Sequence, residues 1–164
     1  MLDLTNLKAP IEAANGLPNG CYVDADLFQH EQNTLFRDNW AAIGFGKDLP
    51  KSGCVKPIEF AGLPLLLVRN QDNEITVFEN VCRHRGMILV SEAQQLRGPI
   101  TCPYHAWSYT LQGELKRSPS KFTQQGFDPA SKSLFSVAVQ NWRGFVFINL
   151  DKVHATPLES TMDG

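Results

Sequence analysis

Two short segments hold the side chains of this sequence that are best suited to bind a metal. The first contains Cys82 and His84, with one residue between them. The second contains Cys102 and His105, with two residues between them. Thiolate and imidazole groups are ligands that transition metals prefer. Each pair follows a strand-like segment, so the sequence predicts two neighbouring loop tips that bring their side chains to one metal centre.

Three interpretations of this ligand set compete. In the first, the cysteines fill the core and the histidines make ordinary hydrogen bonds, which suits one such pair better than two. The second is a structural zinc site of the Cys₂His₂ kind, although zinc loops usually space their ligands more widely than Cys82 and His84. The third is a Rieske [2Fe–2S] cluster, in which two histidines replace two cysteines on one iron. It fits best, because each loop supplies one thiolate and one imidazole.

The neutral imidazoles of such a cluster affect its reduction potential. Two ferric ions, two sulfides and two thiolates sum to zero charge, whereas a cluster with four thiolates is more negative. The neutral cluster accepts an electron more readily, and Rieske centres span about −150 to +300 mV against about −400 mV for plant-type ferredoxins. The imidazole edges that do not bind iron can titrate, so the potential is expected to depend on pH.

The loops CRHRG and CPYHAW resemble those of the Rieske domain at the N-terminus of oxygenase α-subunits, the ring-hydroxylating and related Rieske non-haem iron oxygenases. The similarity extends to LFRDNWAAIG, DLPKSG, LPLLLVRNQDNEITVFENVCRHRG and RGFVFINL. The resemblance implies that Cys82 and Cys102 hold one iron of the cluster. It implies that His84 and His105 hold the other iron through Nδ1.

Short β-branched or aromatic segments between turn residues predict an all-β domain with a short N-terminal helix. The resemblance specifies a Rieske-type antiparallel β-sandwich with two cluster-binding loops. Strands are expected over residues 40–45, 54–60, 63–70, 75–81, 107–111, 114–116, 134–140 and 143–150. The stretch 68–78 is typical of a hairpin, and a polar loop should run from Arg117 to about Lys132. The apolar run 145–148 predicts a last strand buried on both faces.

A helix is expected from about Ala25 to Asp38, with Asp24 as its N-cap. Apolar residues near helical spacing should dock it on the domain: Leu27, Phe28, Leu35, Phe36 and Trp40. We expect four parts along the chain: a flexible lead-in over 1–20, an N-terminal helical extension over 21–40, a Rieske domain over 41–150, and the start of a linker to a catalytic domain over 151–164.

Several residues beside the predicted ligands could tune the cluster: Arg83, Arg85, Tyr104, Trp107 and Tyr109. The two arginines either offset the charge of the reduced cluster or bind an acidic partner, with solvated surface positions as the alternative. Tyr109 either donates a hydrogen bond to a cysteine sulfur or packs in a strand.

Respiratory Rieske proteins, by comparison, carry an extra cysteine in each loop, where this sequence has Met87 and Tyr104, so their disulfide is excluded here. They also place a hydroxyl donor where this sequence has Trp107. Because a hydrogen bond to a cluster sulfur raises the potential, its loss predicts a value in the lower part of the Rieske range. Ala106 stands where the family commonly has glycine, which should shift the loop slightly without removing a ligand.

The oxygenases of this family activate O₂ at a mononuclear Fe(II) held by two histidines and a carboxylate. The remaining histidines here, His30 and His154, lie far apart in sequence and are expected at the surface. No catalytic residue is therefore predicted, and the mononuclear iron should belong to a catalytic domain outside this chain. A stand-alone Rieske ferredoxin is the alternative, and a zinc-binding scaffold is a third hypothesis.

The composition is that of an ordinary globular domain, with 43% hydrophobic and 20% charged residues in a chain of 164. A net charge of −2 argues against nucleic-acid binding. No signal peptide or membrane-length apolar run is visible, which predicts a cytoplasmic protein without membrane contact.

The resemblance also implies partners and substrates. The expected electron donor is a flavin-containing NAD(P)H-dependent reductase or a ferredoxin, and the full-length enzyme is expected to be a homotrimer. Two substrate classes stay open on the sequence. One is aromatic-ring dioxygenation, as in aromatic hydrocarbon catabolism, and the other is monooxygenation or demethylation of a quaternary amine.

Overall fold

The computed structural model describes residues 5–119, 126–151 and 156–162. The helices are α1 (Gly20–Val23), α2 (Ala25–Asn33), α3 (Leu35–Asp38) and α4 (Leu158–Met162), with 3₁₀ turns η1 (Thr5–Lys8), η2 (Gly46–Asp48) and η3 (Ala130–Lys132). The strands are β1 (Ala41–Phe45), β2 (Cys54–Phe60), β3 (Leu63–Arg69), β4 (Ile75–Glu79), β5 (Gln94–Gln95), β6 (Ile100–Thr101), β7 (Ser108–Tyr109), β8 (Leu115–Arg117), β9 (Ser136–Trp142) and β10 (Phe145–Asn149).

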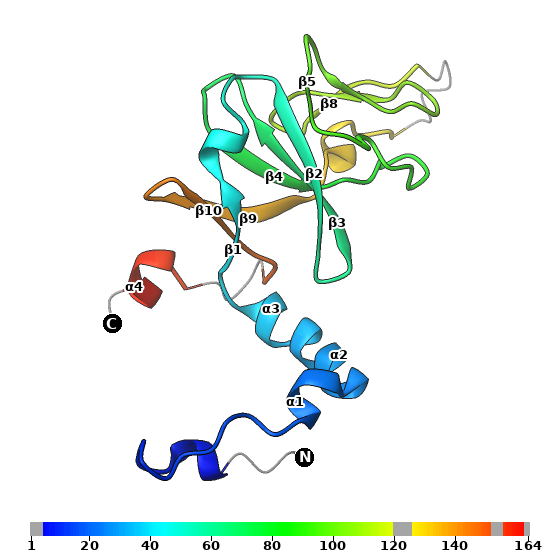
Figure 1. The fold of residues 1–164 in the computed structure, drawn as a ribbon. Helices are drawn as coiled ribbons and strands as arrows, with labels where there is room; N and C mark the ends of the chain where they lie inside the picture. Colours follow the sequence, from blue (N-terminus) through cyan, green and yellow to red (C-terminus); the bar gives the residue numbers. More distant parts are fainter. Residues whose placement is uncertain (1–4, 120–125, 152–155, 163–164) are drawn as a thin grey trace.

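The strands form two antiparallel sheets, which confirms the predicted fold class. The larger sheet has the order β1-β10-β9-β4-β3-β2-β5, and the smaller has the order β6-β7-β8. Helices α1 to α3 trail away from the β-domain, and the small sheet lies on its far side (Figure 1). None of the helices in the described ranges is long and apolar enough to span a membrane.

Strand β3 shows why the domain needs two hydrophobic cores. Successive side chains of a strand point to opposite faces, and both faces of β3 are buried. Leu66 and Val68 enter the core that also contains both predicted cysteine ligands, which we call the loop core. Leu65 and Leu67 enter a second core with β4, β9 and β10, which we call the sheet core. The central strand therefore links the cluster loops to the body of the sheet.

The predicted strands all have counterparts in the structure, and the predicted hairpin over 68–78 joins β3 to β4. In its turn, the Asn70 N–H donates to the Glu74 carbonyl at 2.9 Å. Strands β5 and β6 were not predicted, because two residues are too few to show a period. The predicted polar loop from Arg117 to Lys132 contains residues 120–125, which lie outside the described ranges.

The prediction that the last strand is buried on both faces is wrong. Val146 and Ile148 of β10 are fully buried in the sheet core. Phe145 points to the other face and is 40% exposed, and Phe147 is only half-buried. On that face the Phe145 ring packs against Phe45 of β1, with centroids 4.8 Å apart, while the sheet core covers only the opposite side.

The N-terminal helix is interrupted, which the sequence did not predict. The Asp24 side chain caps α2 as expected, accepting hydrogen bonds from the Asp26 and Leu27 N–H groups at 2.9 and 3.0 Å. At Thr34 the backbone leaves helical geometry, with φ −122° and ψ −71°, and α3 then runs to Asp38. A β-branched residue whose hydroxyl donates to the His30 carbonyl competes with the helix at this point.

Docking of this helix on the domain is also looser than predicted. Helices α1, α2 and α3 contain no buried residue. Phe28 and Leu35 are 58% and 54% exposed, so neither docks the helix. Phe36 does make contact, with its ring edge-on to Phe60 of β2 at a centroid distance of 6.2 Å. The Trp40 Nε1–H donates to the Thr156 carbonyl at 2.6 Å, which connects the helical extension to the segment before α4.

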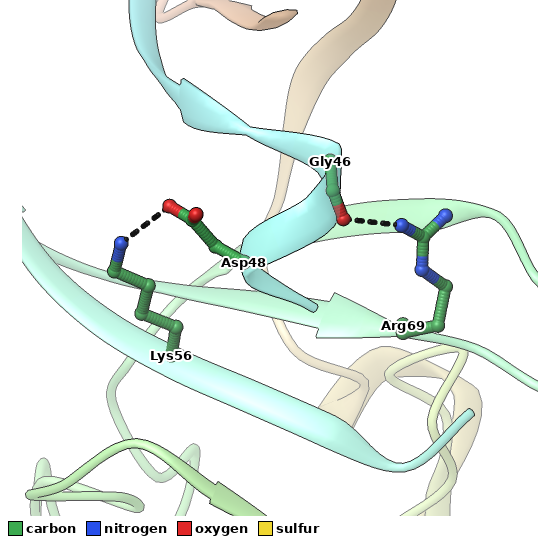
Figure 2. A network of polar contacts seen from close by, with 4 residues as sticks. All are labelled: Gly46, Asp48, Lys56 and Arg69. Carbon is green, nitrogen blue, oxygen red and sulfur yellow. Dashed lines mark hydrogen bonds and ion pairs between the residues drawn. The ribbon is translucent and has the colours of Figure 1, made fainter. Parts of the chain in front are cut away.

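Arg69 ties the 3₁₀ turn η2 to the end of β3. Its Nη2 donates to the Gly46 carbonyl at 2.6 Å and its Nε to the Leu49 carbonyl at 2.8 Å, while Nη1 donates to the Asn73 carbonyl at 2.9 Å. Figure 2 shows the Arg69–Gly46 bond beside the ion pair of Lys56 with Asp48, whose Nζ and Oδ2 are 2.8 Å apart. Two of these carbonyls belong to the η2 turn and the third to the turn between β3 and β4, so one guanidinium holds both turns in place.

Candidate metal centre

The two cluster loops share one backbone design. In the first loop (residues 82–87), the Cys82 N–H donates to the Met87 carbonyl at 2.8 Å, and the Gly86 N–H donates back to the Cys82 carbonyl at 2.9 Å. In the second loop (residues 102–107), the Cys102 N–H donates to the carbonyl five residues on at 2.7 Å, and the Ala106 N–H donates back at 3.1 Å. Each cysteine therefore starts a closed loop of the same shape.

Both loops turn through a left-handed residue at the same place. Gly86 has φ +72° and Ala106 has φ +54°. Glycine adopts this region freely, whereas a residue with a Cβ is strained there by about 1–2 kcal/mol. A glycine would adopt this φ without strain, and the structure shows that alanine still keeps the loop closed.

The four predicted ligands differ in solvent exposure. Cys82 and Cys102 are 2% and 3% exposed, belong to the loop core, and are free thiols. His84 is exposed and His105 is half-buried, and their ring centroids lie 4.9 Å apart. The thiols thus lie on the protein side of the site and the imidazoles toward solvent.

One atom of the site is unsatisfied in a way that a metal would relieve. His105 Nδ1 is buried and has no hydrogen-bond partner among the described residues. A buried polar atom without a partner is costly, so it marks a position where a ligand atom is expected. Across the described ranges, no three His, Cys, Asp or Glu side chains gather at one point as they would around a single ion. A two-iron cluster asks for only two protein ligands at each iron, and the residues fit it.

Tyr109 contacts the first cysteine, Cys82, from within the loop core. Its hydroxyl oxygen lies 3.3 Å from Cys82 Sγ and accepts the Arg83 N–H at 3.0 Å. Burial, and then the contact with Cys82, raise the pKa of Tyr109 well above its usual range, so the phenol keeps its proton. A thiolate carries no hydrogen, so with Cys82 ionised the phenol is the donor of this bond. Both roles foreseen for Tyr109 are present, because it makes the hydrogen bond with Cys82 Sγ and is also fully buried in strand β7.

An aromatic ring packs against each of the two imidazoles. The Trp107 indole of the second loop lies parallel to the His84 ring of the first, with an interplanar angle of 5° and centroids 4.9 Å apart. Tyr104 covers His105 at a centroid distance of 3.7 Å. Although His84 is exposed, partial loss of contact with water lowers its pKa, and the neighbouring His105 and Arg85 lower it further, which favours the neutral imidazole that metals bind.

The two arginines that flank His84 have different surroundings. Arg83 is half-buried and its guanidinium stacks on the Phe135 ring, whereas Arg85 is exposed. Phe135 and Ser131, whose carbonyl accepts from Arg83, were missed by the sequence analysis. Ser131 lies 48 residues from Arg83 along the chain, and nothing in the local sequence announces such a contact. Of the two unassigned histidines, His30 is exposed and His154 lies outside the described ranges.

Comparison with known proteins places this site in a family. The model of the Rieske [2Fe-2S] domain matches residues 39–129, which include both loops. The carnitine monooxygenase oxygenase subunit of Escherichia coli (strain K12) is 33% identical over 159 residues, covering 97% of this chain and 42% of its own length. The glycine betaine monooxygenase oxygenase subunit of Chromohalobacter salexigens is 32% identical over 136 residues, covering 83% of this chain and 30% of its own length.

Solved structures show the same likeness. The apo form of the quaternary ammonium Rieske monooxygenase CntA superposes with a TM-score of 0.83 at 32% identity, over 91% of this chain and 43% of that one. Naphthalene 1,2-dioxygenase with bound indole gives a TM-score of 0.77 at 32% identity, over 86% of this chain and 32% of that one. The chain therefore spans about two-fifths of the carnitine monooxygenase subunit and of CntA, and less than a third of the other two relatives. By its matched domain, its fold and its paired Cys/His loops, the chain belongs to the Rieske [2Fe-2S] family and is similar to the oxygenase subunits of Rieske oxygenases.

Proposed function

We propose that Cys82 and Cys102 bind one iron of a [2Fe–2S] cluster and that His84 and His105 bind the other through Nδ1. The observation that carries this assignment is the shared backbone design of the two loops, which presents one thiol and one imidazole from each. The orphaned, buried Nδ1 of His105 supports the choice of nitrogen. When bound, such a cluster takes up and gives back one electron at a time.

The chain's own residues suit electron transfer at a surface. The buried cysteines anchor the centre to the loop core, while His84 and His105 face outward, where a partner can approach. Trp107 and Tyr104 restrict the two rings, and little rearrangement is then needed when the charge of the centre changes. No residue of this chain is assigned a role in oxygen chemistry.

For the whole protein, the proposed role is that of the Rieske domain of an oxygenase. The domain would receive electrons from a flavin-containing NAD(P)H-dependent reductase, directly or through a ferredoxin. It would deliver them to a mononuclear Fe(II) in a catalytic domain, within a homotrimer. Residues 41–150 are the proposed Rieske domain and 151–164 the start of the linker.

The charge distribution supports an acidic electron donor. Residues 82–117 contain five Lys or Arg and two Asp or Glu, a net charge of +3 in a chain of net charge −2. The remainder of the chain therefore carries −5. Complementary charge speeds the encounter of two proteins, so a donor with an acidic face would approach the basic end that bears the loops.

The substrate class we propose is a quaternary amine. The sequence relatives described above are named for carnitine and glycine betaine, and they give no support to the expectation of aromatic hydrocarbon catabolism. Naphthalene 1,2-dioxygenase also contains this fold. However, a smaller share of its chain matches than of the CntA chain, and its TM-score is lower. We therefore favour monooxygenation of a trimethylammonium compound by the whole protein.

The test of the ligand assignment is spectroscopic. The purified, anaerobically prepared protein should contain two irons per chain and, after reduction with dithionite, show the EPR spectrum of mixed Cys/His ligation. Cys82→Ser and His84→Ala should each lose the visible spectrum, because each removes one ligand. His30→Ala is the matched control, since His30 is exposed and distant in sequence, and it should keep the full spectrum. A colourless wild-type protein with one zinc would reject the proposal.

A further inference from the structure

Arg83, half-buried in the first loop, makes two contacts through its side chain and one through its backbone. Its guanidinium carbon sits 3.6 Å from the Phe135 ring centroid, and Nη2 donates to the Ser131 carbonyl at 3.2 Å. Its backbone N–H donates to the Tyr109 hydroxyl at 3.0 Å. The long side chain therefore spans from the cluster loop to Ser131 of η3 and to Phe135, just before β9. Because the ring and the carbonyl both contact the guanidinium, its charge has little freedom to move.

The charge of Arg83 is also only partly compensated. Its Nε is buried and has no hydrogen-bond partner in the described part of the chain. The one ion pair found in the described ranges joins Lys56 and Asp48, so no described carboxylate neutralises Arg83. A positive charge that is partly removed from water and lacks a counter-ion acts on its surroundings through a lower effective dielectric than a surface charge.

Arg85 provides the contrast. It flanks His84 on the other side, carries the same charge, and is exposed. It makes no hydrogen bond or ion pair with any residue in the described ranges. Exposed charges are screened by salt over roughly 10 Å at 0.1 M ionic strength, whereas partly buried charges are screened much less.

We infer that Arg83 is a fixed cation that sets the reduction potential of the centre, and that Phe135 and Ser131 hold it in place for that purpose. The inference rests on the proposed [2Fe–2S] function. Reduction adds one negative charge at the centre, and a nearby cation stabilises the reduced form more than the oxidised form. Of the two uses foreseen for the arginines, Arg83 thus takes charge compensation, and Arg85 is left for contact with solvent or a partner.

The test is a redox titration of the iron-loaded protein at low and high ionic strength. Arg83→Gln should shift the reduction equilibrium about threefold toward the oxidised form, which is about 28 mV at 59 mV per tenfold change. The shift should persist between about 0.01 M and about 1 M salt, where the screening length falls from about 30 Å to about 3 Å. Arg85→Gln, the matched control, should give a shift that disappears at high salt.

Phe135→Leu provides a second, independent variant. It keeps the arginine but removes the ring under the guanidinium, so the potential should become dependent on salt. This variant decides the question if Arg83→Gln fails to load iron. A wild-type potential in Arg83→Gln at both ionic strengths, or a shift that vanishes with salt as in Arg85→Gln, would overturn the inference. A wild-type potential of Phe135→Leu at both salt concentrations would also overturn the inference. A wild-type protein without an iron–sulfur spectrum would instead refute the proposed function itself.

Discussion

At the scale of single residues, the site combines buried sulfur with outward-facing nitrogen. Cys82 and Cys102 are almost completely buried, while His84 is exposed. This division suits a centre that must be held firmly and still be reached by a partner. We expect the residues that touch these side chains, among them Tyr109 and Trp107, to tune the centre.

Tyr109→Phe should lower the reduction potential of the centre. The variant removes the hydrogen bond to Cys82 Sγ but keeps the ring that fills the loop core. A hydrogen bond of about 1 kcal/mol corresponds to about 40 mV for one electron. A redox titration measures the change, with the visible spectrum as proof that the cluster is intact. An unchanged potential would mean that the phenol does not donate to the sulfur.

Ala106→Gly should stabilise the protein. The φ of +54° at this position strains an alanine by about 1–2 kcal/mol, which outweighs the extra entropy that glycine gains in the unfolded chain, about 0.4–1 kcal/mol. Urea unfolding of the iron-loaded protein should show a midpoint shift in the stabilising direction. Gly86→Ala, at the equivalent place in the first loop with φ +72°, should shift the midpoint the other way. Shifts of equal sign in the two variants would contradict the shared design of the loops.

At the scale of elements, stability depends on contacts between turns that are distant in sequence. Arg69→Met should lower the free energy of unfolding by about 2 kcal/mol, because charged hydrogen bonds to the Gly46 and Leu49 carbonyls are lost at a half-buried site. Chemical denaturation measures the effect. The reduction potential should stay at its wild-type value, since Arg69 belongs to the sheet side of the domain. A changed potential would show that η2 and the cluster loops are coupled.

At the scale of the whole molecule, the free energy of unfolding at acid pH should depend on the ion pair of Asp48 and Lys56. The hydrogen bond from Lys56 lowers the pKa of Asp48 below its ordinary value of 3.8. The pair therefore stabilises the folded state above pH 3.8, and this contribution is lost as the pH falls through the lower pKa of the folded state. Both side chains are about one-third exposed, so the effect is less than about 1 kcal/mol.

Lys56→Met is the variant that measures this contribution. Its free energy of unfolding should be slightly lower than that of the wild type at neutral pH, and the difference should shrink as acid is added below pH 3.8. Denaturant titrations of both proteins over a series of pH values give the comparison. A difference that grows toward acid pH would contradict the assigned direction.

The sequence by itself determined the types and spacing of the candidate metal ligands and most of the strands around them. Alternating and apolar runs mark strands within a few residues of sequence, and paired Cys/His loops are also local features, so both could be predicted. The cap at Asp24 was predictable for the same reason, because an N-cap bonds within its own turn.

The tertiary structure alone decided what lies beside these local features. The contacts of Arg83 with Phe135 and Ser131 and the stacking of Trp107 on His84 join segments far apart in the chain. The exposure of Phe145 depends on which face of its strand the sheet core covers. Whether a strand face is buried depends on which other elements pack on it. Whether an arginine side chain is held in place depends on which distant side chains contact it. Neither is encoded in a period or a spacing, so neither could be predicted from the residues nearby.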